Sequence, residues 1–245
     1  MQPKETKSGR FGVVVVAAGK SARFTQGGAA GAAALQKKPF ITLGDKAAWA
    51  HSVSKFAARE DVVQILLVVS PEDREIIAST FRAELEEYRV ELVGGGAERF
   101  LSVRNALSRL APEVDFVAVH DAARPCVTEE ELDAVFERAR QTRAAMLAVP
   151  VVGSIKRARP DSDRAVVDCA VSRDGLWEAH TPQIFARELI DRAYRDLPEN
   201  AAPTDDCELV AALGVDVELV RGRRTNVKIT TPDDLELAKI YLNCR

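Results

Sequence analysis

Short, continuous apolar runs rich in β-branched residues recur along this chain and restrict the folds that it can adopt. The first run, FGVVVVAA at Phe11–Ala18, is followed by a glycine and is typical of a strand buried on both faces. Four similar runs follow, separated by segments with helical periodicity: Gln64–Ser70, Arg89–Val93, Phe116–His120 and Ala145–Val149. Strands that alternate with helices predict an α/β fold whose central sheet is mostly parallel and flanked by helices.

The predicted helices have recognisable ends. Thr128 and Glu131 form a capping box before ELDAVFERAR. Thr231 and Asp234 begin the helix DDLELAKIYL in the same way, with Pro232 at its first position. The C-terminal part is expected to add two helices and two strands: helices at Leu189–Leu197 and Asp205–Leu213, and strands at Val215–Val220 and Asn226–Thr230.

A segment between about residues 151 and 175 departs from this pattern. Two short alternating stretches, SIKRA and AVVDCAV, are joined by the turn-rich PDSD, which predicts a β-hairpin that leaves the main sheet as a projecting arm. An isolated hairpin is only marginally stable in water, so we expect the arm to pack against something else, with Trp177 anchoring its base. We expect residues 1–245 to form a single domain into which this arm is inserted.

Composition and charge disfavour several classes of function. Charged residues of both signs leave a net charge of −3, so no basic surface is available to hold a nucleic acid. No stretch approaches the ~18 apolar residues of a membrane span, and the polar N-terminus has no apolar signal region. Four widely spaced cysteines fit neither a zinc site nor a disulfide framework: Cys126, Cys169, Cys207 and Cys244. We therefore expect a cytoplasmic protein without nucleic-acid or membrane partners.

The loop after the first strand is where a ligand is expected, because open parallel sheets bind ligands beyond the carboxyl ends of their strands. A Walker A loop would use Gly19-Lys20-Ser21, but its first glycine would then fall on Val14, inside the strand. A dinucleotide fingerprint would place Ser21 and Phe24 where glycines are required. The remaining interpretation is a loop whose backbone N–H groups, with Arg23 and Lys38, surround a triphosphate.

Further motifs begin or follow predicted strands and loops where a pocket would form. They are VGGGAERFLSV (Val93–Val103), VHDAARP (Val119–Pro125), SRDGLWEAHTPQ (Ser172–Gln183) and NVKITTPDDLELA (Asn226–Ala238). Together with AAGKSARF and KPFITLG, they resemble the 2-C-methyl-D-erythritol 4-phosphate cytidylyltransferase family, in order and from about Gly12 to Leu242. This resemblance implies a Rossmann-like nucleotidyltransferase fold and transfer of a cytidylyl group from CTP to 2-C-methyl-D-erythritol 4-phosphate. The products would be 4-diphosphocytidyl-2-C-methyl-D-erythritol and pyrophosphate.

The resemblance also implies roles for individual residues. Arg23 and Lys38 match the pair that stabilises the pentavalent phosphate, and Arg173 and Lys228 match the pair that positions the acceptor. The positions that match nucleotide contacts are Ala17, Ala18, Gly19, Gly96, Ala97, Ser102, Asp121 and Ala122. Those that match acceptor contacts are Arg124, Ser154, Arg173, Thr181, Thr204 and Asp205.

The expected cofactor is Mg²⁺, held mainly by the phosphates with Asp121 nearby, and no organic cofactor is expected. In the family the arm reaches a partner subunit, which implies a homodimer. No general base is required, because a phosphate monoester has its second pKa near ~6 and is largely dianionic at neutral pH. Catalysis would then consist of holding two anions in line and neutralising the developing charge. His120 is expected to be packed and hydrogen-bonded rather than catalytic.

Several residues also have purely structural interpretations. Lys228 could be a solvated strand residue, Asp121 could cap a turn, and Thr204 could be a helix N-cap. Arg173 could hold the hairpin through Asp174. The glycines Gly94–Gly96 could form a plain tight turn.

The sequence departs from the family pattern in one loop, and three other functions are possible alternatives. The loop between Arg23 and Lys38 is longer than is usual in the family, so Lys37 could take the place of Lys38. The nearest rival function is a ribitol 5-phosphate cytidylyltransferase, which shares the nucleotide half of the site. A Rossmann oxidoreductase is disfavoured by the broken glycine fingerprint. A non-catalytic nucleotide-binding protein would not need cations at the reacting phosphorus.

Overall fold

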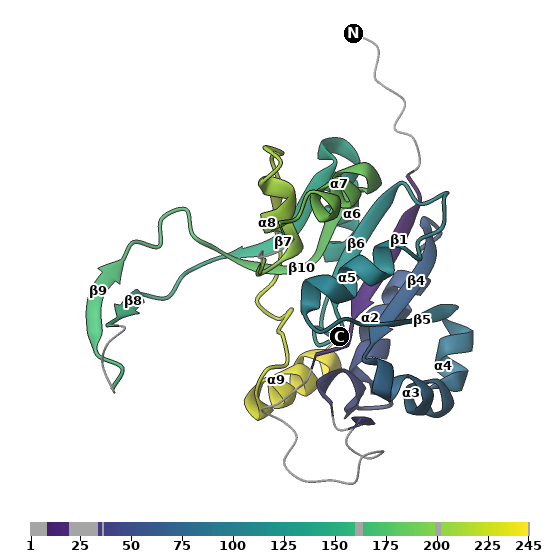
Figure 1. Cartoon of the computed structure of the whole chain (residues 1–245). Helices are drawn as coiled ribbons and strands as arrows, with labels where there is room; N and C mark the ends of the chain where they lie inside the picture. Colours follow the sequence, from purple (N-terminus) through teal and green to yellow (C-terminus); the bar gives the residue numbers. More distant parts are fainter. Residues whose placement is uncertain (1–8, 20–33, 36, 160–163, 199–201, 245) are drawn as a thin grey trace.

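A seven-stranded sheet forms the centre of the computed structural model, which describes residues 9–19, 34–35, 37–159, 164–198 and 202–244 (Figure 1). The strand order is β11-β7-β10-β6-β1-β4-β5, and β10 runs antiparallel to both of its neighbours while the other pairs are parallel. The strand bounds are β1 Phe11–Val16, β4 Val62–Val69, β5 Val90–Gly94, β6 Phe116–Asp121, β7 Ala144–Pro150, β10 Trp177–Ala186 and β11 Glu218–Arg221. The mostly parallel α/β fold and all five strands predicted by apolar runs are confirmed.

Helices cover both faces of this sheet, which explains why β1 is apolar at every position. Val13 and Val15 face one layer, formed by α2 (Ala48–Ala57), α3 (Arg74–Thr80), α4 (Arg82–Glu87) and α6 (Glu129–Thr142). Val14 faces the other layer, formed by α5 (Arg99–Leu107), α7 (Arg187–Arg195) and α8 (Asp206–Ala211). Because both faces are occupied, polar chemistry can reach the sheet only at the ends of its strands.

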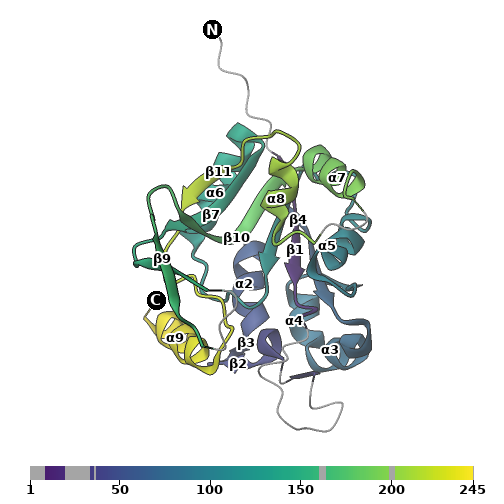
Figure 2. The ribbon, with the colours of Figure 1, turned by 60° about the vertical axis from the view of Figure 1, so that its left-hand side comes forward.

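The C-terminal helix α9, Pro232–Asn243, packs beside the short β2–β3 pair, Thr42–Leu43 and Lys46–Ala47 (Figure 2). Ala238 of this helix, Leu43 and Ile229 belong to a small separate apolar cluster. Two short 3₁₀ helices lie at Lys38–Phe40 (η1) and Pro71–Asp73 (η2). No helix within the described residues is long and apolar enough to span a membrane.

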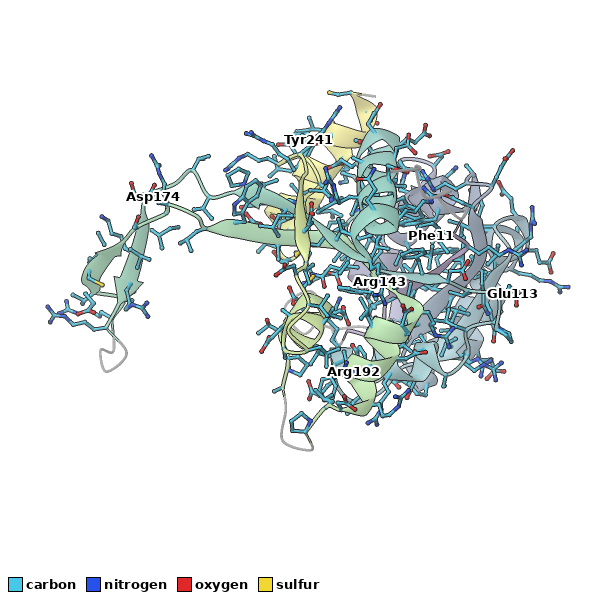
Figure 3. The ribbon with its side chains drawn as sticks, turned by 90° about the horizontal axis from the view of Figure 1, so that it is seen from above. Phe11, Glu113, Arg143, Asp174, Arg192 and Tyr241 are labelled. Atoms are coloured by element: carbon cyan, nitrogen blue, oxygen red, sulfur yellow. The ribbon has the colours of Figure 1, made fainter. Side chains whose placement is uncertain are left out.

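The predicted arm is present. β8 (Ile155–Ala158) and β9 (Val167–Val171) pair as an antiparallel ribbon that projects from the body of the molecule (Figures 1 and 3). Val152 and Val167 are each 57% exposed within this chain. Trp177 lies opposite Pro150 at the base of the arm and is 38% exposed within this chain, so its anchoring role stays a prediction.

Two further expectations about strands need correction. β10 was not foreseen, because Pro182 lies within it and its pairing with β7 is irregular between Ala179 and Gln183, features that argue against a central strand. Asn226–Thr230 is not a strand. Its backbone groups bond elsewhere, with Ile229 N donating to Ala123 O over 2.8 Å, so this segment crosses the end of β6 instead of joining the sheet.

Both predicted capping boxes are formed. At the start of α6, Thr128 Oγ1 accepts from Glu131 N over 3.2 Å, and Glu131 Oε2 accepts from Thr128 N over 2.9 Å. Both side chains are buried. Thr231 and Asp234 make the equivalent arrangement at α9. At α8, however, the N-cap is Asp205 and not Thr204.

We expect Thr128→Ala to lower the free energy of unfolding by about 1–2 kcal/mol, because a buried capping hydroxyl and its reciprocal bond are lost. Urea denaturation should show a lower midpoint at an unchanged slope. The control is Thr80→Ala at the exposed end of α3, which should change stability by less than about 0.5 kcal/mol. Equal effects of the two variants would contradict this account of the cap.

Candidate active site

A cavity of about 400 Å³ opens at the carboxyl ends of β1, β5 and β6. Parallel strands bring these ends to one edge of the sheet, so segments distant in sequence meet there. Its wall contains Val16, Ala17, Ala18, Gly19, Lys38, Pro39, Gly96, Ala97, Glu98, Arg99, Ser102, Asp121, Ala123, Lys228, Ile229 and Thr230. The structure therefore gathers most of the predicted nucleotide positions together with two of the four predicted catalytic cations.

One wall consists mostly of backbone from the glycine turn after β5. Gly95 N donates to Val69 O over 2.8 Å, and Gly96 N donates to Ser102 Oγ over 3.0 Å. A Cβ atom on Gly95 would lie 2.5 Å from the Cβ of Ala18, so the turn touches the chain that follows β1. Gly96, Ala97 and Ser102 line the cavity together with Ala17 and Ala18, and their contacts with a nucleotide stay predictions. Ala122 differs, because it is fully buried in the core and does not line the cavity.

Asp121, the last residue of β6, is the electrostatic centre of the cavity. Its Oδ2 lies 2.6 Å from Lys228 Nζ and 3.9 Å from Arg124 Nε, and its Oδ1 lies 3.3 Å from Arg99 Nε. Burial opposes ionisation, but the charges of Arg99, Lys228 and Arg124 hold the pKa of Asp121 well below its usual range. The carboxylate is therefore ionised and surrounded by three cations.

Arg124 directs its two terminal nitrogens to backbone carbonyls. Nη1 donates to Asn226 O over 2.8 Å, and Nη2 donates to Ala179 O over 3.3 Å. Its side chain is buried and does not line the cavity. Thr181 is also buried; its Oγ1 bonds to Asp121 N over 3.1 Å. The acceptor contacts expected of Arg124 and Thr181 stay predictions, and here both residues brace the end of β6.

The two adjacent lysines of the predicted loop have different surroundings. Lys37 Nζ forms an ion pair with Asp73 and donates to Ser70 Oγ over 3.2 Å, beside the end of β4. Lys38 begins η1 and lines the cavity. Lys38, and not Lys37, is thus the lysine that contributes to the cavity wall. Arg23 lies outside the described residues.

Lys228 belongs to the irregular segment before α9, and buried neighbours fix its place. Asn226 is fully buried and donates from Nδ2 to Thr181 O over 3.1 Å. Ile229, also fully buried, is tied through its N–H to Ala123. The Lys228 side chain itself is 42% exposed. The interpretation of Lys228 as a mere solvated strand residue is wrong, because it pairs with Asp121 and lines the cavity.

The other predicted acceptor residues do not line the cavity of their own chain. Ser154 and Arg173 lie on the arm, outside the cavity lining, and Arg173 Nη1 donates to Val152 O. Asp174, labelled on the arm in Figure 3, accepts from Ser172 Oγ. Thr204 donates from N and Oγ1 to Glu208 Oε2, each over 2.9 Å. Asp205 caps α8 through Oδ1, which accepts from Glu208 N over 2.9 Å, and its Oδ2 accepts from Gln183.

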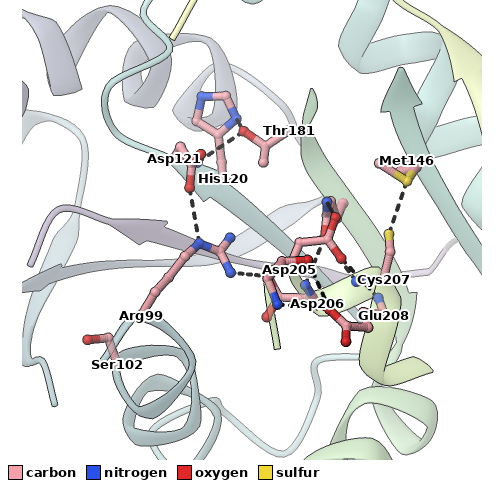
Figure 4. A network of polar contacts seen from close by, with 12 residues as sticks. Arg99, Ser102, His120, Asp121, Met146, Thr181, Asp205, Asp206, Cys207 and Glu208 are labelled. Atoms are coloured by element: carbon pink, nitrogen blue, oxygen red, sulfur yellow. Dashed lines mark hydrogen bonds and ion pairs between the residues drawn. The ribbon is translucent and has the colours of Figure 1, made fainter. Parts of the chain in front are cut away.

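Arg99 was not singled out by the sequence, although it belongs to the VGGGAERF motif. It is the first residue of α5 and bridges two carboxylates, with Nε toward Asp121 and Nη1 2.7 Å from Asp206 Oδ2 (Figure 4). Burial works against its charge, yet these carboxylates raise the pKa of Arg99 above its usual range. Its partners lie 22 and 107 residues away, and only the fold brings them together.

The family model of 2-C-methyl-D-erythritol 4-phosphate cytidylyltransferase matches residues 11–244 of this chain. The chain belongs to this family. A curated member from Solibacter usitatus is 37% identical over 234 residues, covering 95% of this chain and 96% of the relative. A member from Rhodopirellula baltica is 39% identical over 246 residues, covering 95% of each protein.

Solved structures agree with this membership. 4-Diphosphocytidyl-2C-methyl-D-erythritol synthase from Anaerococcus prevotii superposes with a TM-score of 0.78 at 26% identity, covering 96% of this chain and 97% of that one. A second structure of a synthase with the same name has a TM-score of 0.75 at 30% identity, covering 96% and 99%. The resemblance inferred from the sequence motifs is confirmed, as is the nucleotidyltransferase fold that it implied. The chain is thus a cytidylyltransferase-family member.

Gly95→Ala should disturb the cavity wall of this cytidylyltransferase-family protein, because the added methyl group would collide with Ala18 and approach Ser102 Oγ to 3.0 Å. We expect a loss of about 1–3 kcal/mol in stability from overpacking, and weaker binding of CTP as a probe in calorimetry. Gly94→Ala is the matched control, since the nearest atom to its added Cβ is Pro71 Cγ at 3.9 Å. Unchanged CTP binding in the Gly95 variant would count against a nucleotide at this wall.

His120 predicts a pH dependence of stability. It is fully buried, with Nδ1 3.1 Å from Thr181 Oγ1 and Nε2 3.3 Å from Arg124 O, so the expectation that it is packed is confirmed. Burial lowers the pKa of His120 to about 4, from the usual 6.5 of a histidine. Below pH 6.5 His120 is therefore protonated in the unfolded chain but stays neutral in the folded protein. The free energy of unfolding falls as the pH drops from 6.5 towards 4.

The expected loss from this residue across that window is on the order of 3 kcal/mol, at about 1.36 kcal/mol per unit. It is measured as the difference in unfolding free energy between neutral and acidic pH, in the native protein and in His120→Gln. The variant should lose less stability on acidification. Identical pH slopes for the two proteins would rule out His120 as a source of acid sensitivity.

Proposed function

We propose that this chain transfers a cytidylyl group from CTP to 2-C-methyl-D-erythritol 4-phosphate, releasing pyrophosphate. The observation that carries the proposal is the cavity in which Lys38 and Lys228 stand beside the backbone wall formed by Gly96 and Ala18. The wall offers close main-chain contact to a base, and the cations suit two phosphate groups. Membership of the cytidylyltransferase family supports the choice of nucleotide and acceptor.

The reaction requires cationic side chains in fixed positions around the phosphates, and it requires no proton transfer. An oxygen of the acceptor phosphate attacks the α-phosphorus of CTP, the bond from that phosphorus to the bridging oxygen breaks, and pyrophosphate leaves with the electron pair. The described residues that line the cavity include no histidine, which agrees with this demand. In our proposal Arg23 and Lys38 stabilise the pentavalent α-phosphate, while Arg173 and Lys228 position the acceptor.

Mg²⁺ fits this site as a companion of the triphosphate. Within the described residues no group of three or more His, Cys, Asp or Glu side chains could hold a metal ion. Asp121 fits poorly as a direct ligand, because Lys228 and Arg99 already pair with its two oxygens. We propose that Mg²⁺ enters bound to CTP, where it would neutralise phosphate charge, and that Asp121 lies near it without supplying the principal ligand.

The arm supports a shared site in a homodimer. Ser154 and Arg173 flank the β8–β9 ribbon that projects from the body of the molecule, and Val152 and Val167 expose apolar surface on this arm. We propose that the arm docks on a second copy and brings Arg173 to the cavity of that copy. A cytoplasmic location stays a prediction.

The deciding experiment measures pyrophosphate release with CTP or UTP against 2-C-methyl-D-erythritol 4-phosphate and ribitol 5-phosphate. We expect turnover with CTP and the methylerythritol phosphate, abolished by chelation of divalent cations. The nucleotide half of the site does not distinguish the two acceptors, so preference for ribitol 5-phosphate would replace the acceptor in our proposal. Turnover with neither acceptor would favour a non-catalytic nucleotide-binding protein, and NAD binding by titration would point to an oxidoreductase.

Arg23→Ala and Lys38→Ala should each lower kcat by about 10²–10³-fold, the usual effect of removing a preorganised donor at a developing charge. The thermal unfolding midpoint should stay close to that of the native protein. Lys239→Ala, at an exposed position on α9, is the control and should retain full turnover. Near-normal turnover in both cavity variants would refute their assigned roles.

A further inference from the structure

The ion pair between Lys228 and Asp121 poses a problem for the proposed reaction. Lys228 Nζ lies 2.6 Å from Asp121 Oδ2, so the lysine must be shared with, or given up to, an anionic acceptor. Asp121 is buried, and a buried carboxylate that loses a partner is destabilised unless another cation compensates it. Some other group must therefore hold Asp121 while Lys228 changes partner.

Arg99 meets this requirement by its geometry. It contacts Oδ1 of Asp121 (Figure 4). Lys228 contacts Oδ2, so the two cations pair with different oxygens. The Arg99 side chain is only partly exposed and lines the cavity. Its contact with Asp121 can persist after Lys228 has turned towards a phosphate.

A second carboxylate fixes Arg99 from the far side. Asp206 is fully buried, accepts from Arg99 Nη1 over 2.7 Å and accepts from Tyr194 OH over 2.5 Å. Its backbone N–H donates to Gln183 Oε1 over 3.1 Å, which docks the start of α8 on β10. The guanidinium is thus held between a rigid carboxylate in α8 and the carboxylate at the end of β6.

Arg124, the third cation paired with Asp121, is badly placed to replace Arg99. Arg124 Nε stands 3.9 Å from Asp121 Oδ2, and its terminal nitrogens are bonded to backbone carbonyls. Among the described ion pairs of Asp121, that of Arg99 is made with Oδ1, whereas those of Lys228 and Arg124 are made with Oδ2.

We propose that Arg99 is a positioning residue that keeps Asp121 in place and charge-compensated while Lys228 is transferred from Asp121 to the acceptor phosphate. This inference rests on the proposed function. Without Arg99, Asp121 depends more strongly on its ion pair with Lys228. The acceptor phosphate must then compete with a stronger ion pair to bind Lys228. The defect should therefore fall on the KM for the acceptor and spare the KM for CTP.

The test compares variants that separate this role from folding. Arg99→Met alone leaves Asp206 without its cation, so the double variant Arg99→Met/Asp206→Asn removes both charges and keeps an acceptor for Tyr194. We expect the double variant to unfold within a few degrees of the native protein. Its KM for the acceptor should rise at least about tenfold, and its KM for CTP should change by less than about threefold.

Asp206→Asn is the matched control, because Arg99 keeps its charge and its contact with Asp121 while the asparagine oxygen can still accept from Nη1. Its KM for the acceptor should stay within about threefold of the native value. A well-folded double variant with a normal KM for the acceptor would overturn the inference, as would a rise confined to the KM for CTP, which would make Arg99 a nucleotide contact. Absence of turnover in the native protein would instead contradict the proposed function on which the inference rests.

Discussion

Burial of the central strands on both faces is the constraint from which the rest of this structure follows. β1 places Val13 and Val15 against one layer of helices and Val14 against the other, so no position along it is free for a polar group. Functional groups are consequently displaced to the carboxyl ends, where Asp121 ends β6 and the glycine turn follows β5. The site is built where the apolar core stops.

Local signals in the sequence predicted much of the fold. Apolar runs located five strands, and the pairs Thr128–Glu131 and Thr231–Asp234 located two helix starts, because these features depend on neighbouring residues alone. The sequence does not predict β10, because Pro182 lies within the strand and its pairing partners, β6 and β7, are distant in the chain. Asn226–Thr230 has strand-like composition, yet tertiary hydrogen bonds decide its path.

Residues of the candidate site could be predicted where they belong to recognisable sequence motifs. Lys38, Lys228 and Asp121 were found from a family resemblance and do meet in one cavity, whereas Ser154 and Arg173 on the arm do not line it. Arg99 shows the limit of such reasoning. Its importance comes from bridging Asp121 and Asp206, and no spacing along the chain reveals that juxtaposition.

The buried guanidinium of Arg124 has a mechanical consequence. One nitrogen holds Ala179 O, near the place where the arm returns to the sheet, and another holds Asn226 O, two residues before Lys228. A planar group of fixed dimensions therefore ties the root of the arm to the lysine segment. Neither segment can shift alone without breaking one of these bonds. The position of the arm relative to the sheet and the position of Lys228 are therefore coupled.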